Sequence, residues 1–192
     1  MTRARNLADF NTLNIDPSSL DDTGTIPSAL LAGVGGKVLQ VQHRKFNSYL
    51  NNSVTSVNST SWTATEITDQ ITPTSTTSKI LVMINASLSQ YEGSGSGLKF
   101  GAGIYRRVGT GAFVRAYAGQ DNSYGGYGES SGNTERTSSF PTTLIFVDEP
   151  NTNNTVDYKL YLKLLTATGQ GDNVNTGASN QERSITLMEI AA

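Results

Sequence analysis

The sequence predicts an all-β domain of the jelly-roll sandwich class, and three observations lead to this prediction. From Lys37 onwards, apolar residues recur at every second position in short segments, which is the period of a half-buried strand. Glycine, asparagine, serine and proline separate these segments, as expected of turns. No helical period is visible in this part, and the abundant Ser, Thr and Asn suit strand faces and turns better than helices.

At least eight strands are expected, and the chain shows no internal repeat that would indicate a propeller or a β-helix. They cover residues 37–46, 60–68, 79–88, 99–108, 112–119, 141–150 and 156–165 and the terminal segment 183–192. Segment 79–88 is apolar on both faces in its first half, which is typical of a central strand. The terminal segment is equally apolar, so we expect it in the middle of a sheet too.

Individual residues can be assigned within these strands. Strict alternation in 37–46 would place Leu39, Val41 and His43 on one face and Val38, Gln40, Gln42 and Arg44 on the other. Segment 156–165 alternates most clearly and should point Val156, Tyr158, Leu160, Leu162 and Leu164 inward. Trp62 is the expected core residue of 60–68. A hairpin turn is expected at 109–111, where two glycines flank a threonine.

Residues 1–36 differ from the rest and are expected to form a short, mostly extended N-terminal arm and spacer ahead of the domain 37–192. Pro17, Pro27 and a glycine cluster interrupt any helical pattern. The arm carries irregularly spaced apolar residues that it cannot bury alone, namely Leu7, Phe10, Leu13, Ile15 and Leu20. We expect them to attach the chain to another protein; packing on the chain's own domain is the alternative.

Composition excludes several classes of protein. The net charge is −2 with 16% charged residues, and no basic cluster suits a nucleic-acid backbone, so no nucleic-acid partner is expected. Cysteine is absent, which excludes disulfides and thiolate metal sites. No apolar run reaches the roughly 20 residues of a membrane span, and no secretory signal is recognisable, so no membrane insertion is expected. A surface rich in hydroxyl and amide groups is common among extracellular and virion proteins.

No motif indicates catalysis, so no enzyme activity, cofactor or metal is expected. His43 is the single histidine, and no nucleophile or orienting acid is marked near it. The stretch GVGGKV (33–38) lacks the first glycine and the Ser/Thr of a phosphate loop. Asp148–Glu149 and similar acidic neighbours suit solvated turns. A polysaccharide depolymerase, which would need a carboxylate pair in a groove, stays open as a lesser alternative.

The strongest binding candidate is the Tyr/Gly-rich segment 119–133 together with Tyr117, two residues before it. Tyrosine offers flat contact area, glycine allows varied loop conformations, and Asp and Asn supply directional hydrogen bonds. The predicted receptor-binding residues are Tyr117, Asp121, Asn122, Tyr124 and Tyr127. Alternatively, the tyrosines pack on the sheet or across a subunit boundary. Segment 168–182 is a second candidate loop.

The order of several segments resembles a known family. These segments are VLQVQ (38–42), ITPTSTTSKILVMINASLS (71–89), GIYRR (103–107), TLIFVDEPNTNNTVDYKLYLK (143–163) and ITLMEIA (185–191). Together they resemble the C-terminal β-domains of tailed-phage fibre and virion structural proteins, as found in aquatic phages and cyanophages. The resemblance covers about 37–192. It implies a tumour-necrosis-factor-like jelly roll and a homotrimer, and no catalytic residues.

These observations lead to one expected function and one alternative. The chain is expected to be a trimeric bacteriophage tail fibre or spike protein on the virion surface, made in the host cytoplasm. Residues 1–36 would attach it to another virion protein, a tail adaptor or the capsid, and the jelly roll would bind a host surface glycan or protein. The alternative is a capsid decoration or head-fibre protein with a stabilising role.

Overall fold

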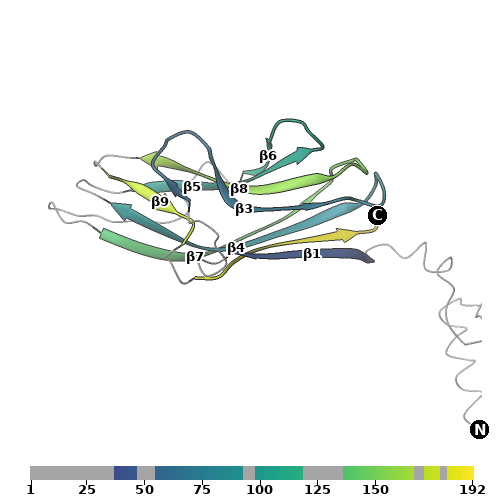
Figure 1. Cartoon of the computed structure of the whole chain (residues 1–192), viewed down its shortest axis with the longest axis horizontal. Helices are drawn as coiled ribbons and strands as arrows, with labels where there is room; N and C mark the ends of the chain where they lie inside the picture. The colour runs from purple at the N-terminus through teal and green to yellow at the C-terminus, as the bar shows by residue number, and fades with distance from the viewer. Residues whose placement is uncertain (1–36, 47–54, 93–97, 119–135, 167–170, 178–180) are drawn as a thin grey trace, which may run out of the picture. The chain divides into compact units, whose positions relative to one another are not determined.

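The chain is described here by a computed structural model that covers residues 37–46, 55–92, 98–118, 136–166, 171–177 and 181–192. In these residues all paired strands are antiparallel and lie in two layers (Figure 1). The expected arm, residues 1–36, lies outside the described residues.

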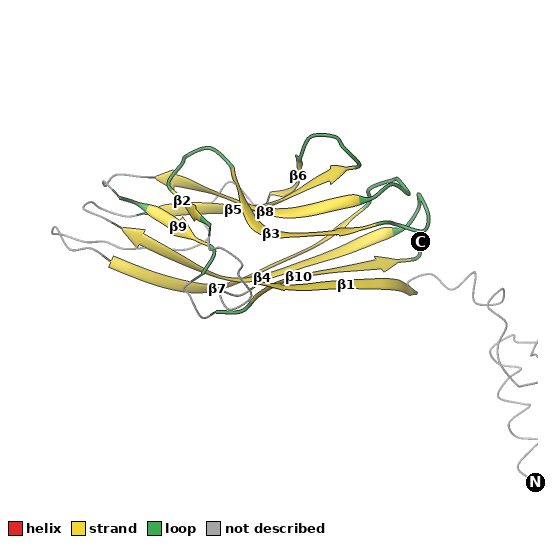
Figure 2. Ribbon diagram, viewed as in Figure 1, coloured by secondary structure: helices red, strands yellow, loops and turns green. Residues whose placement is uncertain are grey.

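The first layer, sheet A, has β4 as its central strand (Figure 2). β4 (Lys79–Glu92) pairs with β7 (Arg136–Asp148) along one side and with β10 (Arg183–Ile190) along the other, and β10 pairs with β1 (Val38–Phe46). The short β9 (Asn173–Asn175) pairs with the far end of β4, and β2 (Ser56–Val57) pairs with β9.

The second layer, sheet B, has the order β3–β8–β5–β6. Its strands are β3 (Thr63–Ile71), β8 (Val156–Thr166), β5 (Lys99–Val108) and β6 (Val114–Ala118). The chain passes from β3 to β4, from β4 to β5, from β6 to β7, from β7 to β8 and from β8 to the strands of sheet A, so it repeatedly changes layer. This connectivity, with the first and last long strands side by side, is that of a jelly roll. The predicted fold class is confirmed, as is the central position of the terminal strand.

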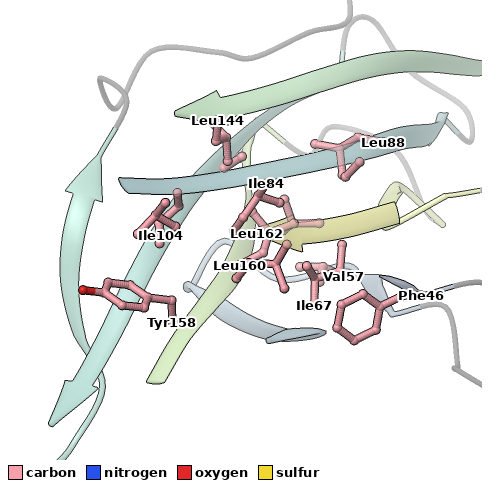
Figure 3. Packing of buried hydrophobic residues seen from close by; sticks show 14 of the residues in the cluster. Phe46, Val57, Ile67, Ile84, Leu88, Ile104, Leu144, Tyr158, Leu160 and Leu162 are labelled. Carbon is pink, nitrogen blue, oxygen red and sulfur yellow. The ribbon is translucent and has the colours of Figure 1, made fainter. Parts of the chain in front are cut away.

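The core fills the space between the two sheets (Figure 3). Its largest contributions come from the inward faces of β4, β8, β5 and β10. On β8 all five residues predicted to point inward are buried, which confirms the alternation seen in the sequence. The predicted hairpin turn is also present: it joins β5 to β6, and Gly109 has a φ of 55°, a value that L-residues rarely adopt.

Three differences from the sequence expectations concern Trp62, Pro141 and the start of β1. Trp62 is partly exposed on the outer face of sheet B, because β3 begins at Thr63 and its inward positions are taken by Thr65 and Ile67. β7 begins before Pro141, which the sheet tolerates because β7 pairs with β4 alone among the described strands. A bulge in β1 after Val38 breaks the strict alternation of 37–46.

The described residues contain no helix long and apolar enough to cross a membrane.

Candidate functional site

The outer face of sheet A carries a continuous apolar area. Strand register aligns Val41 with Met188 and Met188 with Leu81, and Leu81 is aligned in turn with Val147. These four side chains therefore form one apolar row across all four long strands. Val38 and Ile190 pair on one side of this row, and Met83 and Ile145 pair on the other side.

This area, which we call the apolar face, consists of eight residues that share the outward side of sheet A. They are Val38, Val41, Leu81, Met83, Ile145, Val147, Met188 and Ile190. Val38, Val41, Ile145 and Val147 are 50–53% exposed, and the other four are partly exposed. Large contiguous patches of exposed apolar side chains are rare on monomeric soluble proteins, and where they occur they usually mark an interaction surface.

Polar residues border the apolar face along the strands. On one side of it Asn85 and Thr143 lie opposite each other, and the Thr143 hydroxyl donates a 2.8 Å hydrogen bond to Asn85 Oδ1. On the other side Lys79 pairs with Glu149 at 2.8 Å. His43, which faces outward, is 2.8 Å from the Thr186 hydroxyl. An apolar centre with a polar border is the usual anatomy of a protein–protein interface.

The sequence produces this face because β4, β10 and β7 are apolar on both sides over the same stretch. An antiparallel sheet with one solvated face normally alternates apolar and polar residues. Here Ile80, Val82 and Ile84 point into the core, while Leu81 and Met83 between them point outward. The bulge in β1 adds to the face, because it brings Val38 to the same side as Val41.

Three buried ionic groups lie between the sheets, and each is held by several partners. Asp148 accepts hydrogen bonds from Arg106 Nη1 at 2.6 Å and from the Tyr158 hydroxyl at 2.7 Å. Burial, and secondly the Asp148 charge, raise the pKa of Tyr158, so its hydroxyl keeps its proton and remains a donor. The hydrogen bond to Asp148 also raises the pKa of Arg106. This cluster joins β5, β7 and β8.

The second group is Arg183 at the start of β10, which is 1% exposed. Its Nη1 lies 2.9 Å from Glu66 Oε1 and donates to the Thr176 carbonyl at 3.2 Å. Glu66 also accepts from the hydroxyls of Thr55 and Thr176. The cluster connects β10 with β3 and with the segment that follows β9, which is where sheets A and B approach each other.

The third group is Glu189 near the end of β10, with 0% exposure. Its carboxylate accepts from Gln40 Nε2 at 2.6 Å and from both the amide and the hydroxyl of Thr74, at 2.6 and 2.7 Å. Burial alone would raise the pKa of Glu189, but these hydrogen bonds outweigh it and lower the pKa below the ordinary value. The carboxylates of Asp148, Glu66 and Glu189 are thus all engaged by structural partners.

One of the predicted receptor-binding residues can be placed. Tyr117 lies on β6 and stacks on Phe146 with ring centroids 5.2 Å apart, and it packs against the core. This arrangement matches the alternative in which a tyrosine of this region packs on the sheet, so receptor binding by Tyr117 remains a prediction. Asp121, Asn122, Tyr124 and Tyr127 lie outside the described residues, and so do the attachment residues Leu7, Phe10, Leu13, Ile15 and Leu20.

Other predicted features are only partly covered. In the described part of the chain no three His, Asp or Glu side chains gather as a metal site would require. Of the second candidate loop, residues 173–175 form β9, in which Asn175 Nδ2 donates to Asn173 Oδ1 at 2.9 Å. The apolar face was not assigned from the sequence, although the double-sided apolar pattern of 79–84 was the available signal.

No protein-family model and no curated protein matches the chain. Similar solved structures include those of infectious bursal disease virus and of its VP2 subviral particle. The structure of the Gt strain is 12% identical with a TM-score of 0.30, covering 82% of this chain and 39% of that chain. The VP2 subviral particle is 11% identical with a TM-score of 0.34, covering 81% and 39%. The chain therefore spans less than two fifths of these neighbours' length.

Proposed function

We propose that this chain is a virion structural protein, a trimeric fibre or spike in which the apolar face forms the contact between subunits. Residues 1–36 attach it to another virion protein, and the jelly roll binds a glycan or protein of the host surface. The apolar face is the observation that carries the proposal. The resemblance of residues 37–192 to phage fibre domains supports the same assignment.

The energetics of the apolar face favour association. Burying a half-exposed Val or Ile side chain contributes on the order of 1 kcal/mol, since complete burial contributes about 1.5–3 kcal/mol. Val38, Val41, Ile145 and Val147 thus supply about 4 kcal/mol per subunit, and the four partly exposed residues add to this. Two such faces in contact reach the range of the association cost, about 4–15 kcal/mol. Three faces around one axis make a closed assembly that leaves no copy of the face exposed.

Light scattering behind size exclusion tests the subunit contact with the full-length chain. The wild type should elute as three chains, and Val147→Lys should shift it towards a single chain, because a lysine would be buried unpaired in the contact. Thr143→Lys is the matched control, since Thr143 lies on the same strand and face but beyond the apolar residues. It should remain trimeric. A wild type that is a single chain at all concentrations, or a trimeric Val147→Lys, would contradict the proposal.

The attachment role of residues 1–36 needs a test on particles. Replacing Leu7, Phe10, Leu13, Ile15 and Leu20 with serine should leave the jelly roll folded but prevent incorporation into virions. Normal incorporation would show that the arm is not the attachment segment.

The capsid-decoration alternative is distinguished by heating particles with and without the protein, because a decoration protein should raise the temperature at which the particles open.

A further inference from the structure

The outer face of sheet B carries a run of four aromatic rings. Trp62 lies 5.8 Å from Tyr105, Tyr105 stacks on Tyr161 at 4.0 Å, and Tyr161 lies 6.0 Å from Phe113, all measured between ring centroids. All four side chains are partly exposed rather than buried. Tyr161 is on β8 between the inward-pointing Leu160 and Leu162, which fixes this row on the side away from the core.

Two glycines of β5 make room for the indole ring. A Cβ at Gly103 would stand 3.3 Å from Trp62 Cη2, and a Cβ at Gly101 would stand 3.4 Å from the same atom. A Cβ at 101 would be in van der Waals contact with the ring, and a Cβ at 103 would require it to move by a few tenths of an ångström, so the two glycines leave just enough room for it. Trp62 therefore lies close against the sheet, at the start of a run of rings that are tilted to one another by 56° at Trp62–Tyr105 and 52° at Tyr161–Phe113.

Cationic side chains alternate with the rings. Lys163 Nζ lies 4.7 Å from the Trp62 ring centroid, and both Arg107 and Lys159 lie over Phe113, at 4.8 and 5.1 Å. Arg115, which is exposed, is aligned with Tyr105 across β5 and β6. Four cations thus gather on one face of a chain whose net charge is −2.

In the described strands of sheet B, few acidic residues lie among these cations. Asp157 is the one acidic residue of β5, β6 and β8, and it pairs with Arg107 at 3.2 Å. On β3, Glu66 is held by Arg183, and Asp69 lies with Asp157 at a shallow pocket that Arg44 also lines. The described acids are therefore engaged or gathered at one end of the face, while Lys159 and Lys163 lie over rings of the run.

We propose that this aromatic–cationic face, made of Trp62, Tyr105, Phe113, Tyr161, Arg107, Arg115, Lys159 and Lys163, binds an acidic polysaccharide. Sugar rings present C–H groups that pack on the electron-rich faces of aromatic rings, and carboxylate or sulfate groups form charge-assisted hydrogen bonds with lysine and arginine. Cation–π contacts at exposed sites are weak, so a ligand anion can compete for these cations. The inference deepens the proposed function and rests on it only in taking the host surface as the source of the polymer.

Single-stranded nucleic acid also binds to aromatic rings among basic side chains. Such sites combine the rings with a basic groove along the phosphate backbone, usually in a strongly basic domain. This chain has a sequence pI of about 5.4, and its cations are spaced among rings on a sheet surface. An acidic sugar polymer, whose rings pack on the aromatic side chains, fits this arrangement without the continuous basic groove that a phosphate backbone requires.

Affinity electrophoresis of the full-length protein tests the inference. The gels contain polygalacturonate, heparin, dextran or oligo(dT). The wild type should be retarded by polygalacturonate or heparin and not by dextran. Lys159→Gln with Lys163→Gln should weaken that retardation at least about tenfold, because two charge-assisted contacts are lost. Lys37→Gln with Lys45→Gln, which removes two exposed lysines at the two ends of the β1 segment in sheet A, is the matched control and should bind as the wild type does.

A second variant tests the rings without removing charge. Trp62→Ala removes one ring and no charge and should weaken binding to the same polymer, with an unchanged circular dichroism spectrum as the check on folding. Stronger retardation by oligo(dT) than by either acidic polysaccharide, no retardation by either, or equal loss in the sheet A control would overturn the inference. Failure to enter virions, with polysaccharide binding intact, would instead overturn the proposed function alone.

Discussion

Removing the buried Arg183 guanidinium should be among the most destabilising changes in this domain. Arg183→Met would leave the Glu66 carboxylate, whose side chain is 15% exposed, without its counter-ion. Breaking a buried pair from one side costs about 3–5 kcal/mol. With a urea dependence of about 2 kcal/mol per M, the unfolding midpoint should fall by about 1.5–2.5 M.

A double-mutant cycle separates the loss of the pair from the loss of packing. Glu66→Gln alone leaves the guanidinium with carbonyl acceptors, Thr176 at 3.2 Å among them, so it should cost less than Arg183→Met. The double variant removes both charges, keeps one amide oxygen as the acceptor for the hydroxyl of Thr55 or Thr176, and should be clearly more stable than the sum of the two single effects predicts. Urea unfolding of the wild type and the three variants at one protein concentration gives the four unfolding free energies. They are comparable if the dependence of the free energy on urea concentration is the same in all four. Strict additivity, or a loss below about 1 kcal/mol for Arg183→Met, would refute the reasoning.

Three further changes test other parts of the structure. Because the pKa of Glu189 is lowered in the folded state, the ionised carboxylate stabilises the fold above about pH 4.5, and this stabilisation is lost as the pH falls through the folded-state pKa. Glu189→Gln should therefore flatten the acid side of the profile of unfolding free energy against pH. An unchanged profile would contradict this. Tyr158→Phe removes a donor to Asp148 and should cost about 1.5–3 kcal/mol in urea unfolding, whereas a neutral result would mean that this hydrogen bond contributes nothing net. Gly109→Ala forces alanine to a φ of 55° and should cost about 1 kcal/mol, with Thr110→Ala as a near-neutral control; equal effects would refute the strained-turn explanation.

The strands that could be predicted best are those whose inward residues are aliphatic and alternate without interruption. β8 is the clearest case, since every second residue from Val156 is buried. β5 begins and ends where the sequence placed it, because a glycine- and serine-rich stretch of sequence precedes it and the Gly109–Gly111 turn follows it. β2 and β9 were missed because they have two and three residues, too few to show a period.

Trp62 shows why the outer surfaces were harder to predict. Its size suggested burial, but what allows it to lie on the surface is the small cross-section of Gly101 and Gly103 on another strand. Strand pairing brings these residues together over some 40 positions of sequence, and no local pattern records this. The apolar face likewise draws Val41, Leu81, Val147 and Met188 from four separated segments, so it becomes visible only in the register.

The two faces lie on opposite layers of one sandwich, and this has a consequence for binding. If the apolar faces pack together, sheet B of each subunit faces away from the contact, and the trimer presents three aromatic–cationic faces. A polymer that reaches two of them binds the second at high effective concentration, whereas a short oligosaccharide binds one.

Val147→Lys should therefore weaken retardation by polygalacturonate by at least about tenfold without changing the affinity for a short galacturonate oligomer, measured by calorimetry. Thr143→Lys should change neither. Equal weakening for polymer and oligomer would mean that Val147 acts on the site itself. Unchanged binding of the polymer by a single-chain Val147→Lys would mean that one sheet B face accounts for all of the affinity.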